Sequence, residues 1–359
     1  MKSLYKYLRT RWLTITAEWL LIVLLITLPG CTKRVYLQAS SVSNGNHYDT
    51  GFPDKDCSDQ LETILKSVKK VNCFVNYRTY VFGEQSHIIL SDLKNEQLIS
   101  KIQASLLTNE ATSGTALVVL SDKSKLALLT CAHVVDLPDT VINWSEYSDL
   151  GSNRYIHSIS VKIRQLIAVR DMGENNSFTL LASDHSSDLA LLGRISSEPA
   201  APAPVFPFPA GDSKDLGWGS FIYLAGYPAG QLMVTKGIVS KAVDARSNFL
   251  TDAPFNEGFS GGIALATREG VPNFELVGIG RSVSARTEYY LKPEKENYEY
   301  SYNPAIPYQG SLYVSQKKDL NYGITWVIPI NQVREFYLSN RQKLHATGFD
   351  LDTIFGITK

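Results

Sequence analysis

The chain has 359 residues, 44% of them hydrophobic and 19% charged, which is enough for one large domain or two smaller ones. Its formal net charge is zero, so the sequence gives no support to a nucleic-acid partner or to a polybasic membrane surface. Short runs of β-branched and aromatic residues lie between scattered Gly and Pro, and this texture predicts many short strands and few long helices.

The first 30 residues have the pattern of an export signal. Four basic residues stand within residues 1–11, and an uninterrupted apolar run follows at residues 19–28. The segment 28–31 resembles a bacterial lipobox, which predicts that residues 1–30 are removed and that Cys31 carries lipid. The alternative is an uncleaved anchor, but the run contains Glu18 when it is extended and stays shorter than the roughly 20 residues that span a bilayer.

Both interpretations place the rest of the chain outside the cytoplasm, membrane-anchored in the bacterial cell envelope on its periplasmic or extracellular face. Residues 31–55 are rich in Ser, Asn, Gly and Asp and are predicted to be a flexible tether. Apolar side chains at helical spacing predict a short N-terminal helix over residues 58–70. That helix would hold Cys57 and Cys73 roughly 20 Å apart, so no disulfide is expected between them.

A candidate general base comes next along the chain. Residues 113–119 and 128–135 have the pattern of two strands joined by a polar turn, which puts His133 at the end of the second strand. Because an imidazole can take a hydroxyl proton near neutral pH, His133 is suited to general-base catalysis. For a single histidine the alternative interpretation is a core side chain beside a strand.

Two further segments carry a candidate acid and a candidate nucleophile. Asp188 opens the apolar strand 189–192, so its carboxylate must find solvent or a buried donor, and a histidine ring N–H is such a donor. Ser260 stands among glycines in residues 258–262, where a tight turn can expose its hydroxyl. The same turn can point the amides of Gly258 and Ser260 at one spot as an oxyanion hole. Alone, this segment would be an ordinary turn.

The order His133, Asp188, Ser260 is the chain order of the chymotrypsin arrangement. With these motifs the sequence resembles the HtrA/Deg branch of trypsin-like serine proteases from about residue 71 to residue 333. Further segments that carry the resemblance are residues 219–228, 234–240, 277–279 and 322–329. Too few residues follow residue 333 for a PDZ domain, so a protease domain alone is expected.

The resemblance implies an all-β fold, a chymotrypsin/trypsin-like double β-barrel with a C-terminal helix, over residues 56–350. The two barrels are expected at about residues 71–205 and 206–330, and the closing helix at about residues 331–346. An enlarged loop or extra hairpin is expected on the first barrel at residues 139–178, because the interval from His133 to Asp188 is longer than the family typically shows.

The activity implied is that of a serine endopeptidase (a hydrolase) that cleaves envelope or extracellular proteins or peptides through an acyl-enzyme. Ser260 is the expected nucleophile, His133 its general base and Asp188 the residue that orients His133, with the Gly258 and Ser260 amides on the oxyanion. No cofactor or metal is expected, since the six histidines show no ligand spacing. The alternative is a catalytically silent trypsin-fold protein that binds peptides or partners through its cleft. Nothing in the sequence supports a homo-oligomer.

Substrate specificity is expected from a pocket next to Ser260. The resemblance assigns its floor to Pro254 and Phe255, and its wall to the strand at residues 278–280. This pocket therefore comprises Pro254, Phe255, Gly278, Ile279 and Gly280. Neither floor residue carries the carboxylate that would bind Arg or Lys, so small or medium apolar side chains are the expected preference.

Two departures from the family pattern bear on the site. Phe259 stands where the family usually has Asn or Asp, and because Phe cannot pair with a freed N-terminal amine, activation by cleavage is not expected. The insertion at residues 282–321 is rich in Tyr. One hypothesis is that it shapes or covers the cleft, since Tyr gives a large contact area at low entropic cost. The other is an exposed hairpin with aromatic cross-strand pairs.

Overall fold

The computed structural model describes residues 47–53, 55–122, 124–148, 154–172, 177–196, 202–241, 248–293, 305 and 311–357. The predicted export signal, the predicted lipidation of Cys31 and most of the predicted tether lie outside these residues. Within them, no helix has the length and hydrophobicity needed to cross a membrane.

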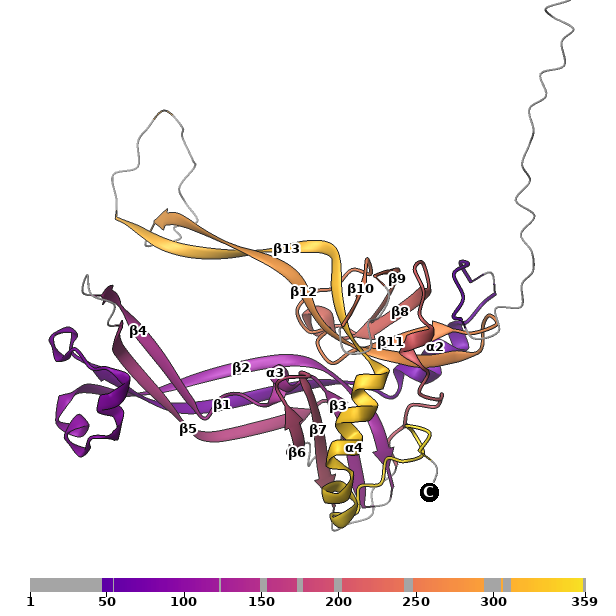
Figure 1. Ribbon diagram of the computed structural model, residues 1–359, viewed down its shortest axis with the longest axis horizontal. Coiled ribbons are helices and arrows are strands. Elements are labelled where there is room, and N and C mark those ends of the chain that lie inside the picture. Colours follow the sequence, from indigo (N-terminus) through magenta and orange to yellow (C-terminus); the bar gives the residue numbers. More distant parts are fainter. Residues whose placement is uncertain are drawn as a thin grey trace, which may run out of the picture. The chain divides into compact units, whose positions relative to one another are not determined.

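The first barrel is a ring of antiparallel strands (Figure 1). Its sheet has the order β1-β2-β3-β7-β6-β5-β4, and β5 also pairs with β1, so that six of the seven strands close on themselves. β4 pairs with β5 as the extra hairpin expected within residues 139–178. The strands are β1 (Val68–Phe82), β2 (Ile102–Ser121), β3 (Lys125–Thr130), β4 (Thr140–Ser148), β5 (Arg154–Val169), β6 (Ser177–Asp184) and β7 (Leu189–Ile195).

The second barrel closes in the order β10-β13-β12-β11-β8-β9. All its pairings are antiparallel, and the short β10 completes the ring by bonding to β9 and β13. The strands are β8 (Phe221–Gly226), β9 (Met233–Lys241), β10 (Phe249–Thr251), β11 (Ile263–Thr267), β12 (Phe274–Pro293) and β13 (Leu312–Pro329). The predicted fold class, an all-β double barrel, is confirmed.

Helices are few and short except at the C-terminal end. The helix expected at residues 58–70 ends at Leu65, because β1 already begins at Val68. The closing helix is α4, which follows β13 directly. The helices are α2 (Ser58–Leu65), α3 (Ala132–Val135), α4 (Ile330–Ala346) and the 3-10 turns η1 (Glu84–Ser86), η2 (Leu90–Lys94), η3 (Glu96–Lys101), η4 (Ser213–Asp215) and η5 (Pro228–Gly230).

Residues 47–53 differ from the flexible tether expected there. The Tyr48 side chain is fully buried, and its hydroxyl donates a 2.6 Å hydrogen bond to Glu275. The Asp49 N–H donates to the carbonyl of Thr267, and the Asp49 carbonyl accepts from Phe221. A tyrosine that buries its ring and satisfies its hydroxyl is anchored rather than solvated, so this stretch belongs to the second barrel.

One apolar cluster joins the two barrels. It contains Leu128 and Leu191 of the first barrel together with Leu265, Ile279 and Ile328 of the second, all at most 1% exposed. Strands buried on both faces read as continuous apolar runs, which is why β3 and β7 lack polar alternation. Because close-packed interiors deform little, the shared core holds the facing edges of the barrels in a fixed relation.

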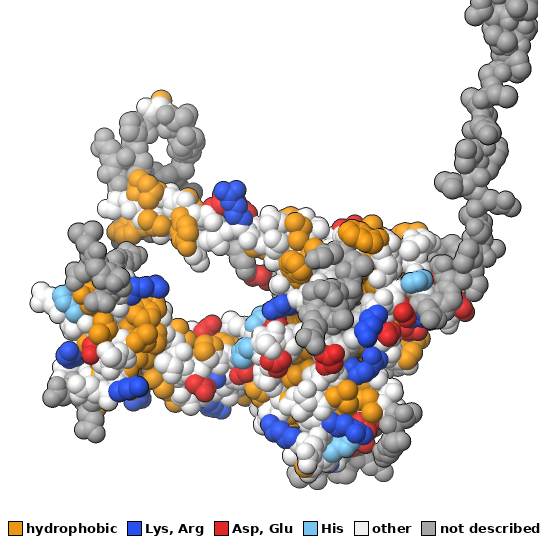
Figure 2. All heavy atoms as spheres, viewed as in Figure 1, with side chains coloured by type: hydrophobic (Ala, Val, Ile, Leu, Met, Phe, Trp, Pro, Cys, Tyr) orange, Lys and Arg blue, Asp and Glu red, His pale blue; other side chains and the backbone are white. Residues whose placement is uncertain are grey.

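Both barrels continue into extensions whose side chains include many exposed hydrophobic residues (Figures 1 and 2). On the first barrel, residues 74–82 of β1, 102–111 of β2 and 154–166 of β5, with β4 along the outer edge of β5, form a four-stranded sheet, hereafter the arm. The arm has a small core of its own, built from Phe82, Ile88, Ile156 and Ile159.

On the second barrel, residues 285–293 of β12 pair with residues 312–320 of β13 as a two-stranded ribbon. The side chains of Tyr289, Tyr290 and Tyr313 are exposed. Their cross-strand partners are Gln316, Ser315 and Lys292, so no tyrosine stands opposite another tyrosine in the described part of the ribbon. The described part of the insertion is therefore an exposed ribbon, and its described tyrosines do not form the aromatic cross-strand pairs of the second hypothesis.

Candidate active site

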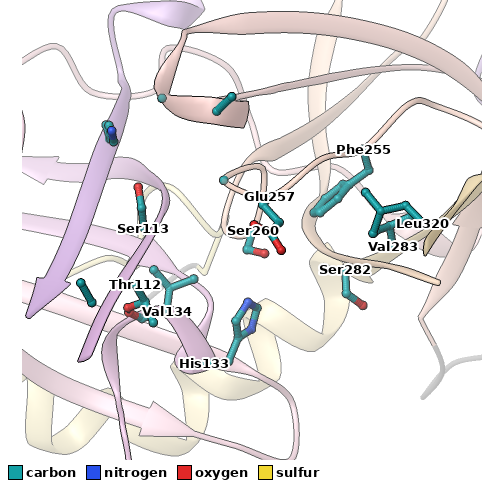
Figure 3. Close-up of a pocket in the computed structure, with 15 residues that line it drawn as sticks. Thr112, Ser113, His133, Val134, Phe255, Glu257, Ser260, Ser282, Val283 and Leu320 are labelled. Atoms are coloured by element: carbon teal, nitrogen blue, oxygen red, sulfur yellow. The ribbon is translucent and has the colours of Figure 1, made fainter. Parts of the chain in front are cut away.

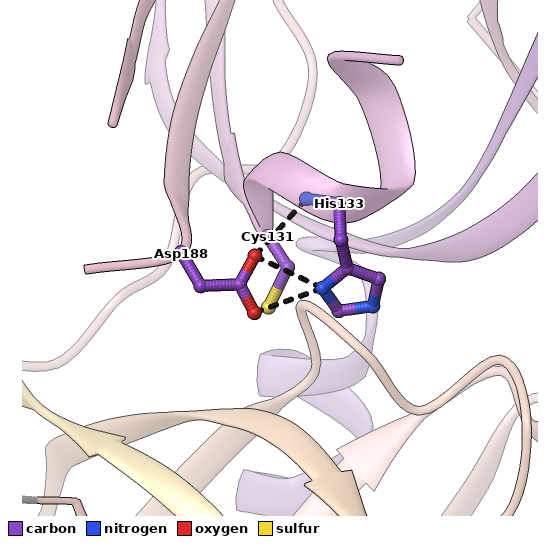
Figure 4. Close-up of side chains that lie close together, drawn as sticks. All are labelled: Cys131, His133 and Asp188. Carbon is purple, nitrogen blue, oxygen red and sulfur yellow. Dashed lines mark hydrogen bonds and ion pairs between the residues drawn. The ribbon is translucent and has the colours of Figure 1, made fainter. Parts of the chain in front are cut away.

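His133 lies in α3, one turn of helix that follows β3. Its backbone N–H donates to Asp188 Oδ1 at 3.0 Å, and its ring Nδ1 lies 2.9 and 2.8 Å from Oδ1 and Oδ2 (Figure 4). Since a carboxylate only accepts hydrogen bonds, Nδ1 carries the proton and Nε2 is left with its lone pair. The His133 side chain is 47% exposed, so that lone pair is open to a substrate.

Asp188 is held where it can orient the imidazole. Its φ of +58° lies in the left-handed region, which Asp tolerates, and its carbonyl accepts a hydrogen bond from Ala132 at the start of α3. The Asp188 side chain is only 9% exposed. Burial opposes its ionisation, but the hydrogen bonds from His133 and the charge of Arg281 outweigh burial and hold the pKa of Asp188 below its ordinary value.

Arg281 contacts two members of the predicted triad, a role that the sequence reasoning missed. Its Nε lies 3.2 Å from Asp188 Oδ2, and its backbone carbonyl accepts the Ser260 hydroxyl at 3.1 Å. Within the described residues the Ser260 hydroxyl has this partner and not His133. The sequence feature that could have indicated this role is the position of the charge, because Arg281 directly follows the Gly-Ile-Gly run of a barrel strand.

Cys131 completes the polar surroundings of Asp188. Its thiol, His133 Nδ1 and the Asp188 carboxylate lie within 4.8 Å of one another, which is the composition of a candidate metal site (Figure 4). Burial and the charge of Asp188 raise the pKa of Cys131 well above its usual value, so the thiol keeps its proton and donates to the Gly280 carbonyl. A protonated thiol and the adjacent Arg281 cation both oppose binding of a metal ion, which favours acid–base chemistry here.

Besides backbone hydrogen bonds, a hydroxyl and an aromatic ring hold the loop around Ser260. The Thr115 hydroxyl of β2 donates to the Gly258 carbonyl at 2.6 Å and accepts from the Tyr227 N–H. The Phe259 ring is buried and packs on Phe255 with ring centroids 5.5 Å apart. The apolar residue beside Ser260 thus has a packed site in the second barrel, which helps to fix the loop in place of an Asn or Asp.

This arrangement leaves two donors free. Gly258 has a φ of +102°, a backbone conformation that glycine adopts without a steric penalty. Among the described residues the N–H groups of Gly258 and Ser260 have no hydrogen-bond partner, whereas those of Phe259, Gly261 and Gly262 are all bonded within the protein. Two neighbouring free amides are the donors that an oxyanion hole needs.

His133 and Ser260 line one cavity of about 610 Å³, a size typical of ligand sites (Figure 3). Gly258 and Phe255 line it as well. Near one end are Ser282, Val283 and Leu320 from the base of the β12–β13 ribbon; other lining residues, Lys70 and Ala111 to Ser113, come from β1 and β2. The Tyr-rich insertion therefore contributes its base to the cavity, while its described tyrosines lie along the exposed ribbon.

Of the five residues predicted for the substrate pocket, only Phe255 lines this cavity. Ile279 is fully buried between strand partners, and Gly280 uses both its N–H and its carbonyl in bonds to Gly262 and Gly261. Gly278 and Pro254 also lie away from the cavity lining. The pocket wall is instead formed by Ser282 and Val283, a few residues further along β12.

The role of Arg281 leads to a prediction. Arg281→Met removes the cation but keeps an unbranched apolar stem, so we expect kcat/KM to fall roughly tenfold as Asp188 loses one of its two side-chain partners. Arg281→Lys should restore part of the loss. The matched control is Arg286→Met, which removes an exposed arginine on the ribbon.

The same variant has an expected pH signature. A carboxylate with a depressed pKa contributes stability above its unfolded pKa, and this contribution is lost as the pH falls through the folded pKa. The groups facing Asp188 are His133, Arg281 and the neutral Cys131 thiol. The deficit in Tm of Arg281→Met at pH 7 should therefore shrink towards pH 3. An equal deficit at both values would mean that Arg281 acts through packing alone.

Two closed antiparallel barrels, with a histidine, an aspartate and a serine gathered where they meet, define the trypsin-like class of fold. The family described as trypsin-like peptidase domain matches residues 114–279, in agreement with that fold. The trypsin-like class predicted from the three motifs is confirmed.

Solved structures of the HtrA-type protease AlgW, determined with a decapeptide or with a tripeptide, are similar to the chain. They are 17–18% identical to it over 80–82% of its length, with TM-scores of 0.40–0.43. The chain covers 64–68% of those structures, about two thirds of their length. None of the curated proteins matches the chain.

Proposed function

We propose that this protein is a serine endopeptidase that cleaves envelope or extracellular proteins through an acyl-enzyme. The observation that carries the proposal is the cavity that His133 and Ser260 share, with the His133 ring held on Asp188 through Nδ1. In this mechanism Ser260 attacks the scissile carbonyl and Nε2 of His133 takes its proton. The amides of Gly258 and Ser260 stabilise the oxyanion, and His133 then protonates the leaving amine.

The first step requires a rotation of the Ser260 side chain. Its hydroxyl must leave the Arg281 carbonyl and reach Nε2 of His133. Such catalytic hydrogen bonds are often long or absent before substrate binds and form in the Michaelis complex. A substrate N–H that pairs with the Arg281 carbonyl would compete for the same acceptor and would favour that rotation.

The second candidate function is a catalytically silent protein that binds peptides in the same cavity. The bond from the Ser260 hydroxyl to Arg281, in place of His133, is the observation that favours it. The two candidates differ in one respect, which is whether Ser260 reacts covalently.

Labelling by a serine-directed phosphonate separates these candidates. Wild-type protein should take up one label, and Ser260→Ala should take up none. Ser315→Ala is the matched control, since Ser315 lies on the ribbon outside the cavity lining and its replacement should leave labelling unchanged. The proposed enzymatic function is wrong if the wild-type protein stays unlabelled and degrades a denatured protein no faster than Ser260→Ala does.

For specificity we propose a preference for small or medium apolar side chains. Phe255, Val283 and Leu320 give the cavity an apolar wall. Glu257 also lines it, but an exposed carboxylate stays hydrated and binds a cation weakly. Cleavage of a peptide library chiefly after Arg or Lys would contradict this preference.

For location we propose the bacterial cell envelope, with attachment to a membrane through the N-terminal segment. The support is the sequence pattern of residues 1–31, where a basic start and an apolar run precede Cys31.

A further inference from the structure

The arm presents an apolar face of its own. Along β1 burial alternates, with Cys73, Val75 and Tyr77 buried and the residues between them exposed. Phe74 lies opposite Ala111 of β2 and opposite Leu166 of β5. Directly opposed residues of antiparallel strands point to the same side of a sheet, so these side chains share the exposed side.

Two rows further out on that same side, past the polar row of Asn76, Asn109 and Arg164, Arg78 lies opposite Leu107 and Val161. Leu107 is 70% exposed. We call this surface the arm face; its apolar residues are Phe74, Leu107, Val161 and Leu166.

The arm face is continuous with the candidate active site. Thr115, Ser113 and Ala111 follow one another on the same side of β2 as Leu107, because alternate residues of a strand share a face. Thr115 holds the Gly258 carbonyl, and both Ser113 and Ala111 line the cavity. At about 3.4 Å per residue, the eight steps from Thr115 to Leu107 span roughly 27 Å, the length of an extended peptide of about eight residues.

Among the described residues of β1, β2 and β5, the charged side chains on this side are all positive, and the carboxylate of Glu257 lies only at the cavity end. Lys70, Arg78 and Arg164 belong to this side, whereas the nearest carboxylate of β2, Glu110, stands on the opposite side because it is offset by one residue. An apolar strip with three cations suits a ligand that alternates apolar with acidic side chains.

We propose that the arm face is an exosite for the substrate polypeptide, which binds an extended apolar and acidic segment some five to eight residues from the bond that is cut. The inference rests on the proposed peptidase function and narrows its substrates to long, unfolded chains. A peptide of three or four residues fills only the cavity, so it gains nothing from the arm face.

The test compares two peptides with one cleavage sequence, a short one and a long one extended on both sides by Leu, Phe and Glu. In Leu107→Ser with Val161→Ser, KM for the long peptide should rise about tenfold, and kcat/KM for the short one should stay unchanged. Leu106→Ser is the matched control, because Leu106 is 52% exposed and lies on the opposite side of β2. It should behave as wild type. Phe74→Ser provides a second, independent variant if the double variant folds poorly, since Phe74 is 46% exposed on the arm face.

A binding measurement tests the exosite independently of catalysis. Anisotropy of the labelled long peptide on Ser260→Ala protein should show about tenfold weaker binding when Leu107→Ser and Val161→Ser are added. If wild type binds the long peptide tightly but does not cleave it, the proposed function is wrong and the exosite is still supported. Equal binding by the Leu107 and Leu106 variants would overturn the exosite. So would sedimentation of wild type as an oligomer that Leu107→Ser disperses, because a second copy would then cover the face.

Discussion

Replacing Ser260 by Ala is expected to lower kcat by about 10⁶, and His133→Ala by a similar factor, while the double variant loses little more. The losses are not additive because neither side chain catalyses without the other: the imidazole has no proton to take, or the hydroxyl has no base. Single-turnover cleavage of the long peptide measures all three variants. Losses that add in free energy would contradict a shared mechanism.

Asp188→Asn belongs to the same prediction with a smaller effect, about 10⁴ in kcat, a magnitude known for this triad in another protein. An amide can hold His133 in the wrong tautomer, with Nδ1 rather than Nε2 free of its proton. Asp184→Asn is the control. Hydrogen bonds from Ser187 and Ser186 lower the pKa of Asp184 to about 2, yet this carboxylate contacts neither His133 nor Ser260. Its replacement should leave kcat within about twofold.

Gly261→Ala is expected to destabilise the fold by more than about 4 kcal/mol or to prevent folding. Its φ is +84°, and an added Cβ would lie 2.0 Å from the Thr115 carbonyl oxygen and 2.5 Å from the Thr130 hydroxyl. Both neighbours belong to the first barrel, so relief of the clash would separate β2 from the loop that carries Ser260. Urea unfolding measures the change.

Gly270→Ala measures the backbone part of that effect without the clash. The difference between the two variants is then the steric part. Gly270 has nearly the same backbone, with a φ of +81°, but an added Cβ would meet nothing within 4 Å. The cost of a left-handed alanine alone is roughly 1–2 kcal/mol. If the two variants lost the same stability, the contact between Gly261 and the first barrel would not be what fixes the loop.

The sequence pointed to three residues that the fold brings together, but not to most of the residues that line the cavity beside them. His133, Asp188 and Ser260 could be found because each stands in a short local pattern, and their chain order restricts the folds that can join them. Arg281 could not be assigned its contacts, since its partner Asp188 is 93 residues away and meets it only through the register of β12. Because of the same register, the residues of β12 that line the cavity are Ser282 and Val283, whereas the predicted pocket residues of this strand were Gly278, Ile279 and Gly280.

The arm was not foreseen for a related reason. The sequence of residues 74–82 is compatible with a strand. The length of that strand beyond the barrel, however, depends on its pairing with β2 and β5. In the sequence alone, the exposed hydrophobic residues of this stretch cannot be told from ordinary strand positions. Only the register of β1, β2 and β5 shows that Phe74, Leu107 and Leu166 lie on one side.

The way in which the oxyanion loop is braced has a consequence for how the protein responds to acid and base. The Thr115 hydroxyl and the Phe259 ring, which both hold the loop, do not titrate between about pH 4 and pH 9. A loop fixed by an ion pair would open when either partner is neutralised, whereas these two contacts do not change over that range. The pH dependence expected for the site therefore arises from its ionisable side chains, and not from a movement of the backbone that carries the amides of Gly258 and Ser260.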